Sequence, residues 1–340
     1  MYGYLFYCLN ATVLWIIHMR YLVVGDIHIK TSNIPQIAEL SDFIVEQTLK
    51  TKPDAVVFLG DVLDYHEKVL TPCLNRAYTL IERVAELAPL YILVGNHDYI
   101  SNMQFLTDNH WMNALKMWKN VTIVDRVIVE NNTTFCPYVF PGRFTEALAT
   151  CPGSSTSEII FCHQEFRGCD MGAVKSEHGD EPGCVSSLVV SGHIHDNQQL
   201  SSNIRYVGAP LQHTFSEKEK RVLFLMDGTN IVEIPIGIGL KRSVPLAYIE
   251  LDDFNDSQIE IGVDTRLIVS ATVNECKAFK KTAKYKALIK RCKIVFRAVD
   301  AATTPSKKCE YMSFNDVCLN IISDSRNSER LADRFSTIIK

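Results

Sequence analysis

Histidine, aspartate and asparagine recur in this sequence in five short clusters, and each cluster directly follows an apolar run. The clusters are Asp26-Ile27-His28, Gly60-Asp61-Val62-Leu63-Asp64, Gly95-Asn96-His97-Asp98, His163 alone, and Gly192-His193-Ile194-His195. They offer carboxylate, amide and imidazole donors without a thiolate, a mixture that suits Mn, Fe or Zn better than Ca, which prefers oxygen ligands. A lone histidine is usually a core or surface residue, but five clusters at the ends of apolar runs favour one shared site.

The ligand inventory predicts two metal ions. It contains two aspartates, one asparagine and four histidines, more than one catalytic ion takes while keeping a position open. These seven residues are Asp26, His28, Asp61, Asn96, His163, His193 and His195. A shared carboxylate such as Asp61 would hold two ions ~3.5–4 Å apart, the separation used in phosphoryl chemistry.

The apolar runs alternate with amphipathic segments, as strands alternate with helices in an α/β protein. The pattern predicts strands over 21–26, 55–61 and 90–98, with helices over 35–50 and 73–87. Functional groups in such sheets collect at the carboxyl ends of strands. Because strand side chains alternate with a period of two, the outer residues of Asp-x-His and His-x-His would face one point, while Ile27 and Ile194 turn into the core.

After a predicted helix over 102–118, the pattern changes at Val121 to short strands, which suggest a second sheet packed on the first. The predicted fold class is α/β: a two-sheet sandwich flanked by helices over 19–240, followed by a small C-terminal α+β unit over 241–300. Residues 301–340 are interpreted as a linker and a helical tail.

Residues 1–18 are strongly apolar and run into the first predicted strand without a linker. They have no basic n-region and no small-residue cleavage site, and they are short for a membrane span. We interpret them as an extension and not as a working signal, with Met19 as an alternative start, and we expect no stable membrane association. The eleven scattered cysteines, with no C-x-x-C pair, favour reduced thiols in an intracellular protein.

The charge is distributed unevenly along the chain. The net charge of −4 excludes a histone-like polycation, yet residues 241–340 hold 18 basic and 13 acidic side chains against 17 and 26 in residues 1–240. This asymmetry is compatible with metal ions in the body and a polyanion near the C-terminal third. Nine Lys and Arg occur between Lys277 and Arg297 without an acidic residue, either as phosphate contacts or as a solvated helix face.

The ordered motifs D-x-H, G-D-x-x-D, G-N-H-D, a lone His and G-H-x-H resemble those of the calcineurin-like metallophosphoesterase superfamily over residues 20–235. The resemblance implies a first metal held by Asp26, His28 and His195, a second held by Asn96, His163 and His193, and Asp61 as the bridge. Manganese is the expected metal, with iron, zinc and magnesium as alternatives. The implied reaction is in-line attack of a metal-bound hydroxide on phosphorus.

The resemblance also implies a proton-transfer pair within the Gly-Asn-His-Asp motif. His97 would contact the phosphate oxygens and protonate the leaving group without ligating a metal. Asp98 would orient His97.

Within the superfamily, the sequence is similar to the SbcD-type DNA-repair nuclease subunit, especially its phage and large-virus branch. The similar stretches are FCHQEFRGCDMG (161–172), SEHGDEP (176–182) and YVGAPLQHTFSE (206–217), which ends at Glu217. The resemblance implies an exo- or endonuclease of DNA repair or recombination, with residues 241–300 in the position of a DNA-capping domain. DNA is then the substrate, an SbcC-type ATPase subunit and a homodimer are the partner hypotheses, and the cytoplasm, the nucleus or a viral replication site is the location.

Two other interpretations stay open. A metallophosphatase acting on a phosphoprotein or a small phosphoester would share every metal ligand, so the motifs do not separate it from a nuclease. A scaffold that has lost catalysis would lack ligands, and none is missing. His66 and His213 adjoin the motifs, and each is either close to the substrate or a surface residue.

Overall fold

The computed structural model describes residues 18–66, 68–172 and 174–299, so the predictions for the apolar extension and for the linker and tail lie outside the described residues. Three of the five clusters follow strands of a six-stranded sheet of order β12-β11-β1-β2-β3-β4. Its strands are β1 (Arg20–Val24), β2 (Ala55–Phe58), β3 (Leu90–Leu93), β4 (Val121–Val124), β11 (Val222–Asp227) and β12 (Asn230–Pro235). The first four run parallel, which brings their carboxyl ends to one edge, whereas β11 and β12 pair antiparallel beside β1.

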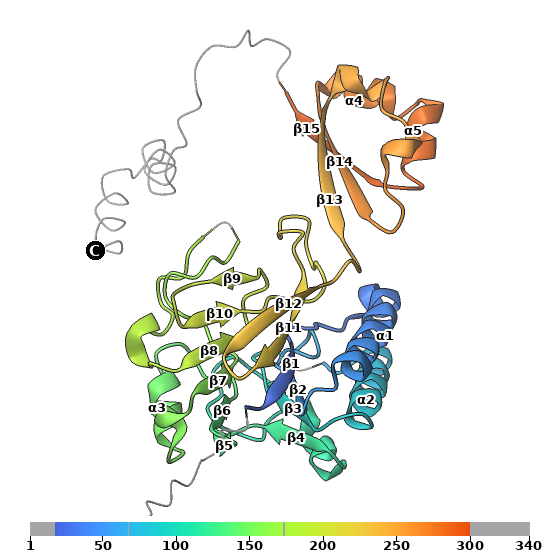
Figure 1. The fold of residues 1–340 in the computed structure, drawn as a ribbon. Coiled ribbons are helices and arrows are strands. Elements are labelled where there is room, and N and C mark those ends of the chain that lie inside the picture. Colours follow the sequence, from blue (N-terminus) through green and yellow to red (C-terminus); the bar gives the residue numbers. More distant parts are fainter. Residues whose placement is uncertain (1–17, 67, 173, 300–340) are drawn as a thin grey trace, which may run out of the picture.

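Two amphipathic helices cover one face of this sheet, α1 (Ile34–Thr51) and α2 (Thr71–Ala85) (Figure 1). Each has a proline in its first turn, where the missing N–H costs no helical hydrogen bond. Buried side chains from both helices form one apolar core with the sheet, among them Ile37, Leu40, Leu80 and Ile81. Burial of this kind, at roughly 25 cal/mol per Å² of apolar surface, is the main driving force for the layer.

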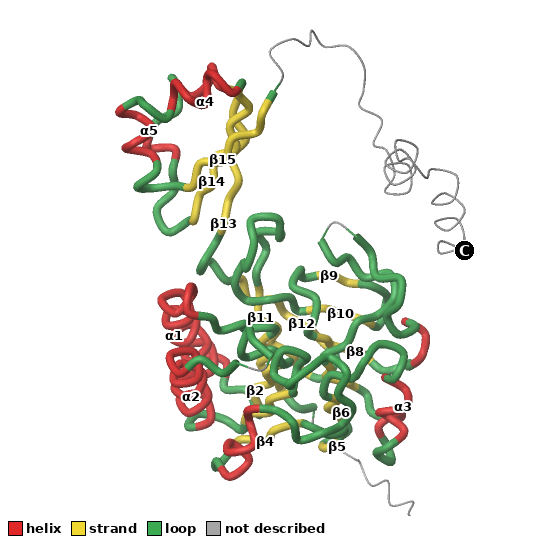
Figure 2. The backbone as a smooth tube through the Cα atoms, turned by 180° about the vertical axis from the view of Figure 1, so that it is seen from behind, coloured by secondary structure: helices red, strands yellow, loops and turns green. Residues whose placement is uncertain are grey.

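A second six-stranded sheet packs against the other face, in the order β5-β6-β7-β8-β10-β9. Its strands are β5 (Ile128–Glu130), β6 (Thr133–Cys136), β7 (Ile159–Cys162), β8 (Leu188–Ser191), β9 (Gln198–Gln199) and β10 (Ile204–Tyr206). Between the sheets, Tyr21 meets Phe161 edge-on with ring centroids 5.1 Å apart, and Phe135 packs beside them. The short helix α3 (Phe144–Ala149) covers the outer face of the second sheet, opposite α1 and α2 (Figure 2). The predicted two-sheet sandwich is therefore confirmed.

Two details of the sequence prediction are wrong. The segments at β4, β11 and β12 were expected in the second sheet, but β4 pairs with β3, and β11 pairs with β1 through registers such as Leu22↔Leu225. Apolar periodicity identifies a strand but not its neighbour. The helix expected over 102–118 is only a 3-10 helix over Trp111–Met117. There the Asn113 amide donates to the carbonyl of Asp108 at 2.6 Å, a local bond that favours a turn over an α-helix.

A separate small unit follows the two-sheet body (Figures 1 and 2). It contains β13 (Lys241–Ala247), β14 (Asp264–Ala271), α4 (Val273–Phe279), α5 (Ala283–Leu288) and β15 (Lys293–Ala298), and its three strands are parallel. Every second residue of β14 is buried, and Leu267 and Val269 pack with Phe279 and Leu288 in a core of their own. The sequence missed β13 as a member of this sheet.

Short 3-10 helices complete the described part of the chain, over Thr31–Asn33, Ser154–Thr156, Pro182–Cys184, Tyr248–Leu251 and Asp256–Gln258. None of the described helices is both long enough and apolar enough to cross a membrane.

Candidate metal centre

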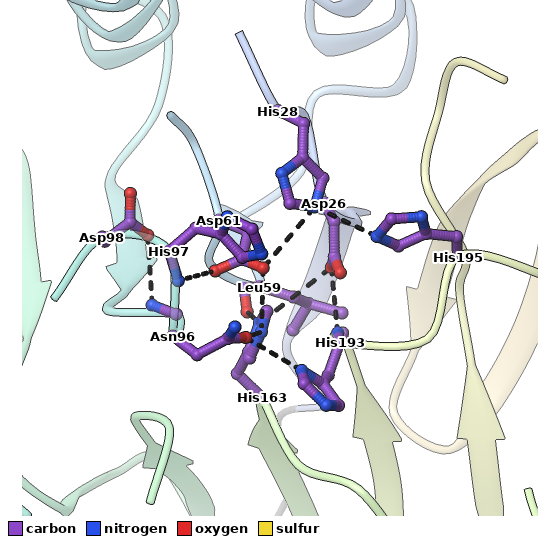
Figure 3. A network of polar contacts seen from close by, with 12 residues as sticks. Asp26, His28, Leu59, Asp61, Asn96, His97, Asp98, His163, His193 and His195 are labelled. Carbon is purple, nitrogen blue, oxygen red and sulfur yellow. Dashed lines mark hydrogen bonds and ion pairs between the residues drawn. The ribbon is translucent and has the colours of Figure 1, made fainter. Parts of the chain in front are cut away.

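The five clusters meet where the carboxyl ends of strands from both sheets face each other (Figure 3). Three sets of side chains place ligand atoms within 4.8 Å of one another. They are Asp26 with His28 and His195, His28 with Asp61 and His97, and Asp61 with His163 and His193. Asn96 joins the last set, because its Oδ1 lies 3.0 Å from Nε2 of His163 and 2.9 Å from Nδ1 of His193. All seven predicted ligands are thus brought together.

Tight turns, and not extended strands, aim these side chains. β1 ends at Val24 and β8 ends at Ser191, so both His-containing motifs lie beyond the strands. His28, Asp61 and His193 have φ angles of 47°, 50° and 75°, a left-handed conformation that side chains other than glycine adopt rarely and that clusters at functional sites. The strand-alternation argument was therefore wrong in its reason, although Ile27 and Ile194 do turn into the core as expected.

Glycines let the backbones approach the ligands closely. Gly60 has φ 110°, and a Cβ on it would lie 2.7 Å from Nδ1 of His163. A Cβ on Gly192 would lie 2.5 Å from Oδ1 of Asp26. The glycines of these motifs therefore serve the packing of the site itself.

Each ligand histidine turns one ring nitrogen inward and holds the other against an oxygen. Nδ1 of His163 donates to the carbonyl oxygen of Leu59 at 2.7 Å. Nδ1 of His28 lies 3.3 Å from Oδ1 of Asp64, within ion-pair distance but without the geometry of a hydrogen bond. Such outer partners fix the orientation and tautomer of a metal-binding imidazole.

The same arrangement recurs at the two histidines of the last motif. Nε2 of His193 lies 3.7 Å from Glu165, and Nδ1 of His195 lies 3.5 Å from Glu217. Glu217 is itself held by the buried Arg221 at 3.3 Å. The sequence did not predict the partners Asp64 and Glu165, although Asp64 is the last residue of the Gly-Asp-x-x-Asp motif and Glu165 follows His163 by two positions.

The inward-facing atoms fit a cation. With Nδ1 of His163 donating outward, Nε2 of the neutral ring carries a lone pair, yet it faces Oδ1 of Asn96 at 3.0 Å and Oδ2 of Asp61 at 3.3 Å. Nε2 of His28 faces Nε2 of His195 at 3.1 Å. Oδ2 of Asp26 is buried and has no hydrogen-bond partner among the described residues. Converging lone pairs and an unpaired carboxylate oxygen are what a divalent ion would satisfy.

The electrostatics of the ligand set point the same way. Burial opposes a proton on His163, but the carboxylates of Asp61 and then Asp26 raise its pKa to about 9. Burial would raise the pKa of Asp61, but the nearby imidazoles, His163 above all, bring it well below its usual value. The ligand set therefore favours a positive charge between these carboxylates, which a divalent ion would supply.

His97 lies inside this group, but its partner is not the predicted one. Its Nδ1 donates to the carbonyl oxygen of Asp64 at 2.7 Å, and its ring stacks on His66 with centroids 4.6 Å apart. Oxygens of the Asp98 carboxylate accept instead from the indole of Trp111 at 2.8 Å and the amide of Gly95 at 3.1 Å. The prediction that Asp98 orients His97 is thus corrected. Asp98 links the loop after β3 to Trp111, and the carbonyl oxygen of Asp64 orients the His97 ring.

Burial, followed by the charge of Asp61, raises the pKa of Asp98 to about 7.

His213, whose role the sequence did not decide, lies at the site as well. Its ring is 5.0 Å from that of His28 and 5.2 Å from that of His195, and its Nε2 is buried without a partner in the described structure.

Comparison with known proteins agrees with the geometry. The profile of the calcineurin-like phosphoesterase family matches residues 19–197. A protein of Invertebrate iridescent virus 6 named "Putative phosphoesterase 244L" is 40% identical over 275 residues, which are 77% of this chain and 97% of that protein. "Putative phosphoesterase 078R" of Invertebrate iridescent virus 3 is 39% identical over 280 residues, 79% of this chain and 81% of the relative.

Among solved structures, the phosphoesterase Yfce from E. coli aligns over 64% of this chain and 100% of its own, with 13% identity and a TM-score of 0.29, too low to bear on the fold. The family profile and the two viral relatives suffice: this chain belongs to the calcineurin-like phosphoesterase family.

Proposed function

We propose that this chain is a two-metal phosphodiesterase that cleaves DNA, with manganese as its metal. Phosphoesterase chemistry follows from the family, and its dinuclear site matches the ligand sets described above. The choice of DNA is supported by one feature outside the metal centre, the C-terminal unit with its exposed lysines.

Separate residues would bind the metal ions and transfer the proton. Two bound divalent ions supply Lewis-acid activation and neutralise charge that develops on the phosphoryl group. Asp26, His28 and His195 would hold one ion, Asn96, His163 and His193 the other, and Asp61 would bridge them. His97 donates its Nδ1 proton to the carbonyl oxygen of Asp64, and the imidazolium form of the ring would give its second proton, on Nε2, to the leaving oxygen and become the neutral imidazole.

The proposal that DNA is the substrate rests on the basic C-terminal unit. Lys277, Lys281, Lys286 and Lys290 are exposed on and beside α4 and α5. The same unit contacts the loop 207–221, between β10 and β11, which carries Glu217 and His213 beside the metal ligands. A polyanion can occupy such a surface and the metal centre together, whereas a small phosphoester needs only the centre.

The test is a substrate panel with purified protein and Mn²⁺. We expect hydrolysis of single-stranded DNA or duplex ends and of bis(p-nitrophenyl) phosphate, and loss of all activity with a chelator. Hydrolysis of p-nitrophenyl phosphate or a phosphopeptide without any cleavage of DNA would favour the phosphatase alternative.

A further inference from the structure

A hollow of about 470 Å³ lies between the loop that follows β2 and the loop that follows β3. It is lined by Tyr65, His66, Lys68, Ile100, Ser101 and Asn102. Tyr65 is 43% exposed and Ile100 is 47% exposed, so an aromatic and an aliphatic side chain both present surface to this space. The metal centre itself uses none of these six residues.

The hollow lies next to His97, the proposed proton donor, and only the ring of His66 separates them. His66, in its wall, stacks on His97 with centroids 4.6 Å apart and an interplanar angle of 18°. The carbonyl of Asp64, two residues before His66, accepts from Nδ1 of His97 at 2.7 Å. The hollow therefore lies beside the side chain that is proposed to protonate the leaving oxygen, and it is a candidate position for the group attached to that oxygen.

Charge distinguishes this hollow from the second cavity at the site. That cavity, of about 320 Å³, is lined by three carboxylates, Asp170, Asp196 and Glu217, together with His193 and His195. The described residues that line the hollow beside His97 include a lysine and no carboxylate. A nucleotide chain, with its phosphates, is better accommodated on the His97 side.

We propose that this hollow binds the nucleobase of the leaving nucleotide. A base has two apolar faces and a polar edge. The Tyr65 ring and the Ile100 side chain offer surfaces for the faces, and Lys68, Ser101 and Asn102 offer polar groups for the edge or the next phosphate. The hollow is wide open to solvent, as a stacking surface can be, and stacking of a base on an aromatic side chain is tolerant of sequence. This inference rests on the proposed function and specifies its leaving group.

The test uses substrates with a single scissile bond. The probes are thymidylyl-thymidine and its two analogues that lack one or the other base, assayed with Mn²⁺-loaded protein. For the wild type we expect one analogue, the one without the leaving-side base, to be hydrolysed about tenfold less efficiently, mainly through KM. Tyr65→Ala should bring the parent substrate down to that level and remove the difference, while Tyr65→Phe keeps it.

A second test variant and a matched control accompany Tyr65→Ala. Ile100→Ser should weaken the base dependence in the same direction. Met103→Ala changes a residue that is 71% exposed in the same loop but does not line the hollow, and it should behave as wild type.

The outcomes separate the two proposals. Equal hydrolysis of all three probes by the wild type, or full base dependence in folded Tyr65→Ala, would overturn the nucleobase site and leave the phosphodiesterase intact. Failure to hydrolyse any of the three, with phosphomonoesters still cleaved, would overturn both.

Discussion

Each ligand histidine turns one ring nitrogen towards the other ligands and the second towards an oxygen on its outer side, and this arrangement orients the ligand set before a metal binds. The outer nitrogens of His163 and His195 are held by the Leu59 carbonyl and by Glu217. The inner nitrogens are therefore left facing other lone pairs, an arrangement that is costly without a cation. Metal binding should stabilise the folded protein, because the folded state binds the ion and the unfolded chain does so far less.

The first prediction separates proton transfer from ligation at His97. We expect His97→Gln to lower kcat by about 10²–10⁴-fold, the usual contribution of a general acid, while both metals stay bound. Metal content measured by atomic spectroscopy on the purified variant, beside kcat on a diester, decides the matter. Since His97 lies within ligand distance of His28 and Asp61, loss of one ion in this variant would show that it ligates.

The second prediction concerns the bridging carboxylate. Asp61 lies 3.5 Å from Nε2 of His28 and 3.3 Å from Nε2 of His163, so it borders both ligand sets. We expect Asp61→Asn to weaken both metal-binding steps, by about tenfold or more each, in calorimetric titration with Mn²⁺. Asn96→Ala should weaken mainly the step at His163 and His193. A single weakened step in Asp61→Asn would contradict the bridging role.

At the scale of elements, the sequence predicts the strands and the ligands better than it predicts how they are connected. β1, β2 and β3 and the helices α1 and α2 are anticipated because their periodicities are local properties of the chain. The membership of β11 in the first sheet depends on tertiary pairing, which periodicity does not encode. The left-handed turns at His28 and His193 are likewise imposed by the packed site and not by residue preference. The partner of His97 was misassigned because it was taken from the resemblance, whereas the bond to Asp64 depends on the tertiary contact of two loops.

One loop connects the metal centre with the C-terminal unit. In loop 207–221, the Phe215 ring lies 4.4 Å from the Arg266 guanidinium and 5.2 Å from the Lys293 ammonium, and Lys241 is 5.7 Å away. The amide of Lys241 donates to the Gln212 side chain at 2.6 Å. Two residues beyond Phe215, Glu217 reaches His195. The loop therefore touches the metal site on one side and three cations of the C-terminal sheet on the other.

The third prediction tests this link. Removal of the ring in Phe215→Ala should weaken the contact between the loop and the C-terminal unit by about 1.5–3 kcal/mol, since three partly exposed cation–π contacts contribute ~0.5–1 kcal/mol each. We expect faster hydrogen–deuterium exchange in peptides that cover 211–217 and 241–247, measured by mass spectrometry. Phe215→Tyr keeps the ring and should exchange as wild type does. Unchanged exchange in Phe215→Ala would mean that other contacts, such as Arg242 with Glu219, hold the unit.

On the scale of the whole molecule, charge is separated in space as well as in sequence. The metal centre lies in the two-sheet body, and the basic run lies in the C-terminal unit, which follows that body as a separate part of the fold (Figure 1). Not every lysine of that run faces solvent freely. Lys280 lies over the Phe296 ring and Lys284 donates to the Asp252 carbonyl, so these two contribute to the packing of the unit. A test of DNA binding should leave both in place.

The control for such a test is a matched set of exposed lysines in the body, Lys50, Lys52 and Lys119. Their joint reversal to Glu changes the net charge by the same amount as reversal of three lysines in the C-terminal unit. It therefore accounts for any effect of overall charge on DNA affinity.

The last prediction is joint reversal of Lys281, Lys286 and Lys290 to Glu. If these side chains contact phosphates, the variant releases fewer counterions on binding, and the slope of log affinity against log salt should fall by about 2 for single-stranded DNA. Affinity at low salt should fall with it, whereas hydrolysis of bis(p-nitrophenyl) phosphate should be unchanged, because that diester needs only the metal centre and His97. Fluorescence anisotropy across a salt series gives the slope. An unchanged slope, equal to that of the body control, would remove the C-terminal unit from substrate binding and favour a small phosphoester as the substrate.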